Sequence, residues 1–153
     1  MTSTVEDLAP GSVRRALSGL PHPDGYDLRV IPLRYRGDKP HLSAWTDFED
    51  RSITIQLPEP FLPFGEVIPY GARRRPGKAM RFIWLTEGVT FRTPREVLRF
   101  LYLHEWMHWY LKEQRGTKSQ AETACDRFAL RNYRKGTVTV DDAREALRRR
   151  REV

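Results

Sequence analysis

The residues of this sequence that are best suited to chemistry lie in the segment His104–His108, which reads His-Glu-Trp-Met-His. On a helix, two histidines four positions apart point within about 40° of each other and can bind one metal ion. Zinc takes three or four such ligands at about 2.0 to 2.2 Å. Glu105 is turned by about 100° from His104, so its carboxylate lies beside the metal and can accept a proton from a metal-activated water. This H-E-x-x-H pattern predicts a zinc site with Glu105 as general base.

The helix that should carry this motif has clear end signals. Thr93 and Glu96 form a capping box, and Gly116 is the expected terminator. The segment 97–111 is apolar nearly all round, which is typical of a helix in the middle of a domain. We therefore predict a buried helix over about 93–115.

Burial of this helix raises an alternative for the motif. His104 and His108 would then be hydrogen-bonded core histidines, and Glu105 an ordinary solvated residue. Three ionisable groups in the most apolar helix are costly to bury without a shared partner, which favours the metal site.

A catalytic zinc usually has a third protein ligand. Glu122 and Asp126 are one turn apart on one face of a helix expected at about 119–133, and the 14-residue step from His108 lets that helix return beside the first. We predict Glu122 as the third ligand and Asp126 as an acceptor that orients a ligating histidine. Ser119 and Glu122 also read as a capping box, so a purely structural role for Glu122 stays open.

Three other side chains could bind zinc but are weaker candidates. His22 lies in a proline-flanked turn and His41 follows Pro40, so both are expected at the surface. Cys125 is turned about 60° from Glu122 and is expected to be a small core residue. An oxyanion stabiliser is not identified; the candidates are Tyr70, Arg73, Tyr110 and Tyr133.

The elements around the motif belong to the α+β class. Alternating apolar and polar residues predict strands at 26–35, 41–45, 52–57 and 79–87. The run Phe82–Leu85 in the last of these predicts burial on both faces. Residues 58–78 carry five of the eleven prolines and are expected to form a long irregular excursion.

Two more helices complete the predicted chain. One should begin at Ser12 and close at Gly19, and the other should run from Thr139 to the end. A length of 153 residues fits one domain, 1–153, with 139–153 as a C-terminal basic helix.

Composition narrows the class of protein. Hydrophobic residues make up 39% and charged residues 31%, which is typical of a soluble globular chain. The single cysteine excludes an internal disulfide and any all-cysteine metal site. The first residues show no signal-peptide pattern, and the apolar stretch in the motif helix is too short and too charged for a membrane span. We expect a cytoplasmic protein without a membrane partner.

The net charge of +7 allows an anionic partner. Basic side chains gather in two segments, and the candidates for contacting DNA are Arg73, Arg74, Arg75, Lys78, Arg144 and Arg148 to Arg151. An ordinary solvated surface is the alternative, because arginines near a helix C-terminus also complement the helix dipole.

From Pro94 to Tyr133 the chain resembles the zincin metallopeptidases, specifically the gluzincin type, in which H-E-x-x-H is followed on another helix by E-x-x-x-D. Here the second pattern is Glu122 to Asp126, and the stretch Glu122–Ala129 is similar to the E-x-x-A-x-x-F-A signature of ImmA/IrrE-type peptidases, with Cys125 in place of alanine. SprT-like proteases, which act on DNA-associated proteins, are the second resemblance, although their third ligand is usually histidine.

The resemblance implies a small, mostly antiparallel sheet packed on a central H-E-x-x-H helix. Its edge strand, at about 79–85, would line a cleft above the metal and pair with an extended peptide. It also implies a zinc-dependent endopeptidase that acts on regulatory or DNA-associated proteins. The alternative is a non-proteolytic protein that uses the same metal-stabilised fold for binding or DNA-associated regulation.

Overall fold

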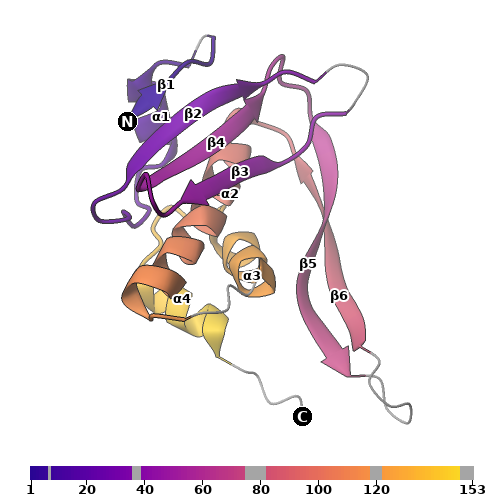
Figure 1. Ribbon diagram of the computed structural model, residues 1–153. Helices are drawn as coiled ribbons and strands as arrows, with labels where there is room; N and C mark the ends of the chain where they lie inside the picture. The colour runs from indigo at the N-terminus through magenta and orange to yellow at the C-terminus, as the bar shows by residue number, and fades with distance from the viewer. Residues whose placement is uncertain (7, 36–38, 75–81, 118–121, 149–153) are drawn as a thin grey trace.

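The computed structural model describes residues 1–6, 8–35, 39–74, 82–117 and 122–148. The helices are α1 (Pro10–Ala16), α2 (Pro94–Trp109), the π-helical turn η1 (Tyr110–Gln114), α3 (Glu122–Asn132) and α4 (Val140–Leu147). The strands are β1 (Thr2–Ser3), β2 (Asp27–Leu33), β3 (Ser43–Asp47), β4 (Ser52–Pro58), β5 (Phe64–Arg74) and β6 (Phe82–Phe91). In Figure 1 the sheet of β1 to β4 lies over α2, and the β5–β6 hairpin stands beside the helices. The α+β class is confirmed.

The four-stranded sheet has the order β1-β2-β4-β3 and is mixed. β1 and β4 both pair with β2 in parallel, and only β3 pairs with β4 antiparallel. The prediction of a mostly antiparallel sheet is therefore wrong for this sheet. After β2 the chain crosses to the far edge, forms β3 there, and returns as β4 between them, which makes β2 and β4 parallel. The alternation of apolar and polar residues along a strand is the same in parallel and antiparallel pairs, so the sequence pattern could not distinguish them.

The segment expected to be an irregular excursion instead contains β5, which pairs with β6 in an antiparallel hairpin. Pro69 lies at a shift of register between Pro69 and Gly71. Proline lacks a backbone donor, and a two-stranded ribbon tolerates that loss because each strand has one partner and one open edge. The proline content of 58–78 therefore marks an irregular strand and not the absence of one.

β6 is not buried on both faces, contrary to the prediction. Ile83 is 39% exposed and Trp84 61% exposed, because this end of the hairpin projects away from the helices. Only the other end of β6, with Val89 and Phe91, joins the core.

α2 begins as predicted. The side chain of Thr93 accepts a hydrogen bond from the backbone N–H of Glu96 at 3.3 Å, and the Glu96 carboxylate accepts from the N–H of Arg92 at 2.9 Å. The helix is buried along most of its length and packs against the sheet and α3. Its end widens into η1 before Gly116, whose φ of +62° favours glycine.

The remaining helices differ from the predictions at their ends. α1 begins after Ala9 and not at Ser12, although Gly19 does adopt a positive φ of +84°. α4 begins after Thr139, as predicted, but ends at Leu147 because Arg148 is extended. α4 therefore ends before the last part of the predicted basic helix, and residues 149–153 lie outside the described part. In the described residues, no helix has both the length and the apolar character needed to cross a membrane.

Candidate metal centre

Two turns of α2 present the histidines of the motif on one side of the helix. The Nε2 atoms of His104 and His108 lie 3.2 Å apart. His108 is buried, and the side chain of His104 is 14% exposed. The four-residue spacing therefore brings the two nitrogens to one point, as the sequence predicted.

The start of α3 brings Glu122 to the same point. Its Oε2 lies 3.1 Å from His104 Nε2, and its Oε1 lies 2.8 Å from His108 Nε2. These three residues form the group among the described ones that could hold a metal ion, with one ligand atom of each within 4.8 Å of the others. In a tetrahedral zinc site with bonds of about 2.0 to 2.1 Å, neighbouring ligand atoms lie about 3.3 Å apart. The observed separations are close to that value.

Asp126, one turn further along α3, contacts the other ring nitrogen of His104. Its Oδ1 lies 2.8 Å from Nδ1. Burial by itself would lower the pKa of His104, but the carboxylates of Asp126 and Glu122 outweigh this and raise that pKa to about 10. Without a metal, His104 is thus a cation with an N–H aimed at each carboxylate. Asp126 fixes the orientation of the ring.

The carboxylate of Glu105 lies beside this group and within the core. Only 4% of the residue is exposed, and its Oε2 has no hydrogen-bond partner among the described residues. Burial, followed by the nearby negative charges of Glu122 and Asp126, raises the pKa of Glu105 to about 7 despite the opposing effect of His104. A carboxylate with this pKa both accepts and donates a proton near neutral pH.

The residues present fit a divalent cation. Two imidazole nitrogens and a carboxylate are ligands that zinc prefers. The hydrogen bond with His104 lowers the pKa of Glu122 to about 2, so this ligand is ionised at neutral pH. Burial and the positive charge of His104 lower the pKa of His108, which keeps this ligand neutral. The unpartnered oxygen of Glu105 adjoins this set.

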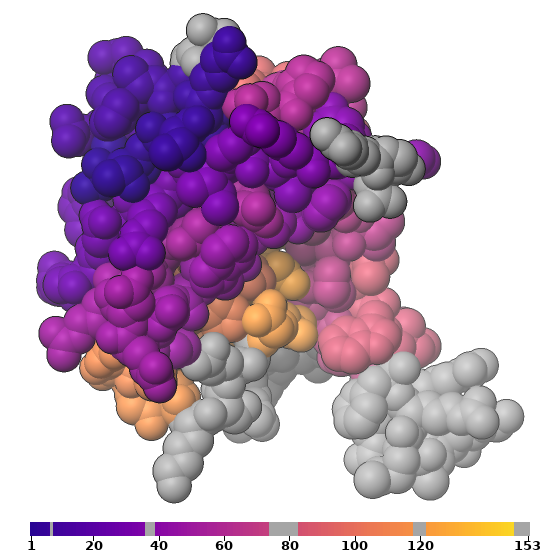
Figure 2. All heavy atoms as spheres, turned by 45° about the horizontal axis from the view of Figure 1, so that its top comes forward, coloured from indigo at the N-terminus to yellow at the C-terminus, as the bar shows by residue number. Residues whose placement is uncertain are grey.

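A small cavity adjoins the site. It has a volume of about 180 Å³, and its lining is Leu42, Ala44, Phe100, Leu101, His104, Glu105 and Asp126. Figure 2 shows orange atoms of the α2–α3 region in a hollow between the purple strands and the pink hairpin. The cavity is apolar except on the side of the metal-binding group.

The strand beside the site is β3, not the segment 79–85. The hydroxyl of Thr46 donates to the backbone carbonyl of Glu105 at 3.3 Å, and Ala44 lines the cavity. β3 pairs only with β4 in the described residues, so its other side is an edge of the sheet. The described part of 79–85, from Phe82, belongs to the β5–β6 hairpin. The prediction of that segment as the edge strand of the main sheet is wrong.

Sequence reasoning missed residues beside the site on both α2 and β3. On α2, Phe100 and Leu101 are one turn before His104, so helical spacing alone could have placed them beside the motif. No comparable signal exists for Ala44 and Thr46, because their approach to α2 depends on the position of β3 in the sheet.

The other candidate ligands are not members of this group, and Ser119, on which the alternative depends, is not described. His22 and His41 are exposed, and Cys125 is fully buried, as predicted. Ser119 lies outside the described part of the chain, so the capping-box alternative for Glu122 stays a prediction. The ring of Tyr110 stacks on Trp106, and Tyr133 packs in the core. The candidates for the oxyanion stabiliser stay predictions.

Few of the basic residues proposed for DNA binding are described. Arg73 is exposed on β5. Arg144 and Arg148 each form a surface ion pair at 3.2 Å, with Asp141 and Glu145 respectively. The side chain of Arg74, the residues Arg75 and Lys78, and Arg149 to Arg151 lie outside the described part. DNA contact stays a prediction.

Comparison of the chain with protein-family models finds no match, and comparisons with curated proteins and with solved structures find none either. The functional argument therefore depends on the geometry of the site.

Proposed function

We propose that this protein is a zinc-dependent endopeptidase with a zincin-like active site. The observation that carries the proposal is the convergence of His104, His108 and Glu122 on one point beside Glu105, whose buried Oε2 has no hydrogen-bond partner among the described residues. A purely structural cluster would satisfy its polar atoms within the chain. An acceptor left open at a group of metal ligands is instead suited to a reacting molecule.

His104, His108 and Glu122 would hold the zinc ion, and Asp126 would orient His104. Zinc in such a site supplies Lewis acidity, which lowers the pKa of a water molecule to about 7 and polarises a carbonyl group. Two imidazoles and one carboxylate leave a coordination position open in a four-coordinate site. An open position distinguishes a catalytic site from a closed structural one.

Glu105 would be the general base. Its ionised carboxylate takes the proton of the attacking water, and the resulting carboxylic acid then donates a proton to the leaving amine. In the metal-free chain, burial raises the pKa of Glu105 to about 7. A bound divalent cation would favour the ionised carboxylate, which is the form that accepts the proton of the water.

β3 and the apolar cavity support a peptide as the substrate. An extended peptide can pair with an open sheet edge through its backbone, with little demand on sequence. The cavity lined by Leu42, Ala44 and Leu101 is of a size for one aliphatic side chain next to the reacting bond. We propose regulatory or DNA-associated proteins as substrates, on the resemblance described above.

The variant Glu105→Gln tests the proposal because it keeps the shape of the side chain and removes the base. We expect cleavage of an internally quenched peptide library to fall about 10²- to 10⁴-fold, with the zinc content unchanged. Glu145→Gln, on exposed α4, is the matched control and should leave both quantities unchanged. Wild-type protein that is loaded with zinc and cleaves no peptide would contradict the proposal and favour a metal-stabilised binding protein. Loss of zinc from Glu105→Gln would show that Glu105 is a ligand.

A further inference from the structure

A second and larger cavity lies on the other side of α2 from the metal centre. Its volume is about 490 Å³, against about 180 Å³ for the cavity beside His104. Tyr102 is the residue of α2 that lines it; the rest of its lining comes from residues 1–28. Tyr102 is two positions before His104, which is about 200° around the helix. The larger cavity is therefore separate from the proposed active site, although it has a size typical of small-molecule sites.

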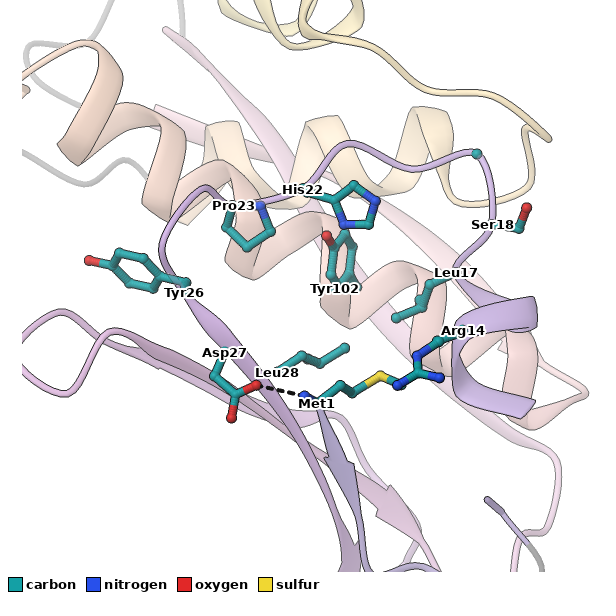
Figure 3. A pocket seen from close by; sticks show the side chains of 11 residues that line it. Met1, Arg14, Leu17, Ser18, His22, Pro23, Tyr26, Asp27, Leu28 and Tyr102 are labelled. Carbon is teal, nitrogen blue, oxygen red and sulfur yellow. Dashed lines mark ion pairs between the residues drawn. The ribbon is translucent and has the colours of Figure 1, made fainter. Parts of the chain in front are cut away.

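The base of this cavity is apolar and already formed. Leu17 is 9% exposed and Tyr102 3% exposed, so both are held by the core. In Figure 3 the ring of Tyr102 lies between His22 above and Leu28 and Met1 below, with Leu17 to one side. An apolar ligand group of several carbons would find a continuous contact surface here.

Most of the polar groups around the cavity are already paired within the chain. The hydroxyl of Tyr102 donates to the carbonyl of Pro21 at 2.6 Å. The carboxylate of Asp27 forms an ion pair at 2.9 Å with the N-terminal amine, and the hydroxyl of Tyr26 donates to Glu113 at 2.8 Å. These groups do not need a ligand.

Besides the hydroxyl of Ser18, two polar side chains of the lining remain without a partner among the described residues. Within the described part of the chain, neither Arg14 nor His22 has a side-chain hydrogen bond or an ion pair. One is a permanent cation and the other is an imidazole, whereas the one carboxylate of the lining, Asp27, is neutralised. The charge of the cavity lining that is not already paired is therefore positive, which favours an anion.

Arg14 differs from its neighbour in a way that the helix dipole does not explain. Arg14 and Arg15 are both in the last turn of α1, where either charge complements the dipole. Arg15 bonds to the hydroxyl of Ser12 at 3.1 Å and does not line the cavity. Arg14 lies at one end of the cavity beside Met1 and Leu17 (Figure 3).

We propose that this cavity binds a small monocarboxylate with an apolar body. The guanidinium of Arg14 matches one carboxylate in a two-bond arrangement, and His22 offers a further polar contact. The apolar body would lie against Leu17, Leu28 and Tyr102. A single permanent cation compensates a single negative charge, which favours a carboxylate over a phosphate dianion.

Octanoate is a suitable probe, and octanamide is its uncharged analogue of similar size. We expect two-dimensional NMR titration of the wild-type chain to show octanoate binding roughly tenfold or more tighter than octanamide, because hydrogen bonds to charged partners are the stronger class. The shifted signals should include those of Leu17, Leu28 and Tyr102. Equal affinity for the two compounds, or no binding at millimolar octanoate, would overturn the proposal.

A carboxylate could also bind zinc directly, so the location of the shifts is part of the test. Shifts that centre on His104 and His108 would mean that octanoate occupies the metal centre, and the proposal would be wrong. The variant Arg14→Gln should weaken octanoate binding roughly tenfold, and the matched variant Arg15→Gln should leave it unchanged. Equal losses in the two variants would indicate general attraction to basic surface and overturn the assignment.

Discussion

α2 carries buried polar side chains at two places along its length, and their hydrogen bonding differs. Near the start of the helix, Arg99 is 2% exposed, yet its guanidinium donates to four backbone carbonyls. The acceptors are the carbonyls of Ala16, Ser18, Tyr133 and Lys135. Further along α2 lies the cluster of His104, Glu105 and His108. There, Glu105 Oε2 and His108 Nδ1 have no hydrogen-bond partners among the described residues.

The difference separates a polar group with a structural role from the one for which we propose a function. Arg99 finds its hydrogen-bond acceptors within the chain, and these bonds connect α1 and the end of α3 to α2. The cluster around the histidines instead brings several atoms that could bind a metal to one point, and it leaves Glu105 Oε2 without a partner among the described residues. Burial alone therefore does not identify a site; unsatisfied groups that converge do.

The largest expected effect tests the structural side of this comparison. Arg99→Met leaves four carbonyls without their donor, and we expect a loss of about 3 to 5 kcal/mol in the free energy of unfolding, measured by urea denaturation. Arg99→Lys should fall between wild type and Arg99→Met, since lysine keeps the charge with fewer donors. Zinc affinity of the folded protein should not change.

The control for this prediction is Arg95→Met, on the exposed side of the same helix, which should change stability by less than about 0.5 kcal/mol. If Arg99→Met were no worse than this control, the four carbonyls would be satisfied by other means and the comparison would fail.

The next effect tests the functional side. Glu122→Ala removes one of the three proposed ligands, and we expect zinc affinity to fall about a hundredfold or more while the circular dichroism of the helices stays the same. Competition with a chromophoric chelator measures the affinity. Glu145→Ala, which removes a glutamate from exposed α4, should retain the wild-type value. An unchanged affinity in Glu122→Ala would place the third ligand elsewhere and restore the capping role as the explanation for this residue.

Asp126→Asn should have a smaller effect on the same measurement. Asparagine keeps a hydrogen-bonding oxygen near His104 Nδ1 but loses the charge, and changes of this kind cost about 10- to 100-fold in metal affinity. A loss as large as that of Glu122→Ala would mean that Asp126 binds the metal itself.

The smallest effect is a dependence of zinc binding on pH. The carboxylates of Asp126 and Glu122 keep His104 protonated in the metal-free chain up to a pKa of about 10, and zinc must displace the proton from Nε2. Affinity should therefore increase with pH, by about tenfold between pH 7 and pH 8 for one displaced proton. Chelator competition at both pH values, corrected for protonation of the chelator, measures it. Equal affinities would show that His104 is neutral before the metal binds.

Much of the site could be predicted from the sequence because its geometry is local. The pair His104 and His108 meets through helical periodicity, and the capping box at Thr93 fixes where that helix begins. Asp126 follows Glu122 by one turn for the same reason. These contacts need only a helix of 3.6 residues per turn, whatever the rest of the fold.

The parts predicted wrongly depend on contacts between distant segments. Nothing in the alternation of 41–45 or 79–87 shows which strand becomes the sheet edge beside α2. β3 takes that place because the chain inserts β4 between β2 and β3, and residues 82–91 pair with β5 instead. Strand pairing is a long-range choice that similar local patterns leave undecided.

The sequence by itself determined where the main helices form, the spacing of the proposed ligands on each of them and the apolar character of α2, because these follow from neighbours within a few residues. Only the tertiary structure decided that Glu122 reaches both histidines and that β3 borders the site. It also decided that the guanidinium of Arg99 has hydrogen-bond partners while Glu105 Oε2 has none among the described residues. The physical reason is that hydrogen bonds and ligand contacts between separate elements depend on how those elements pack, which no single segment specifies.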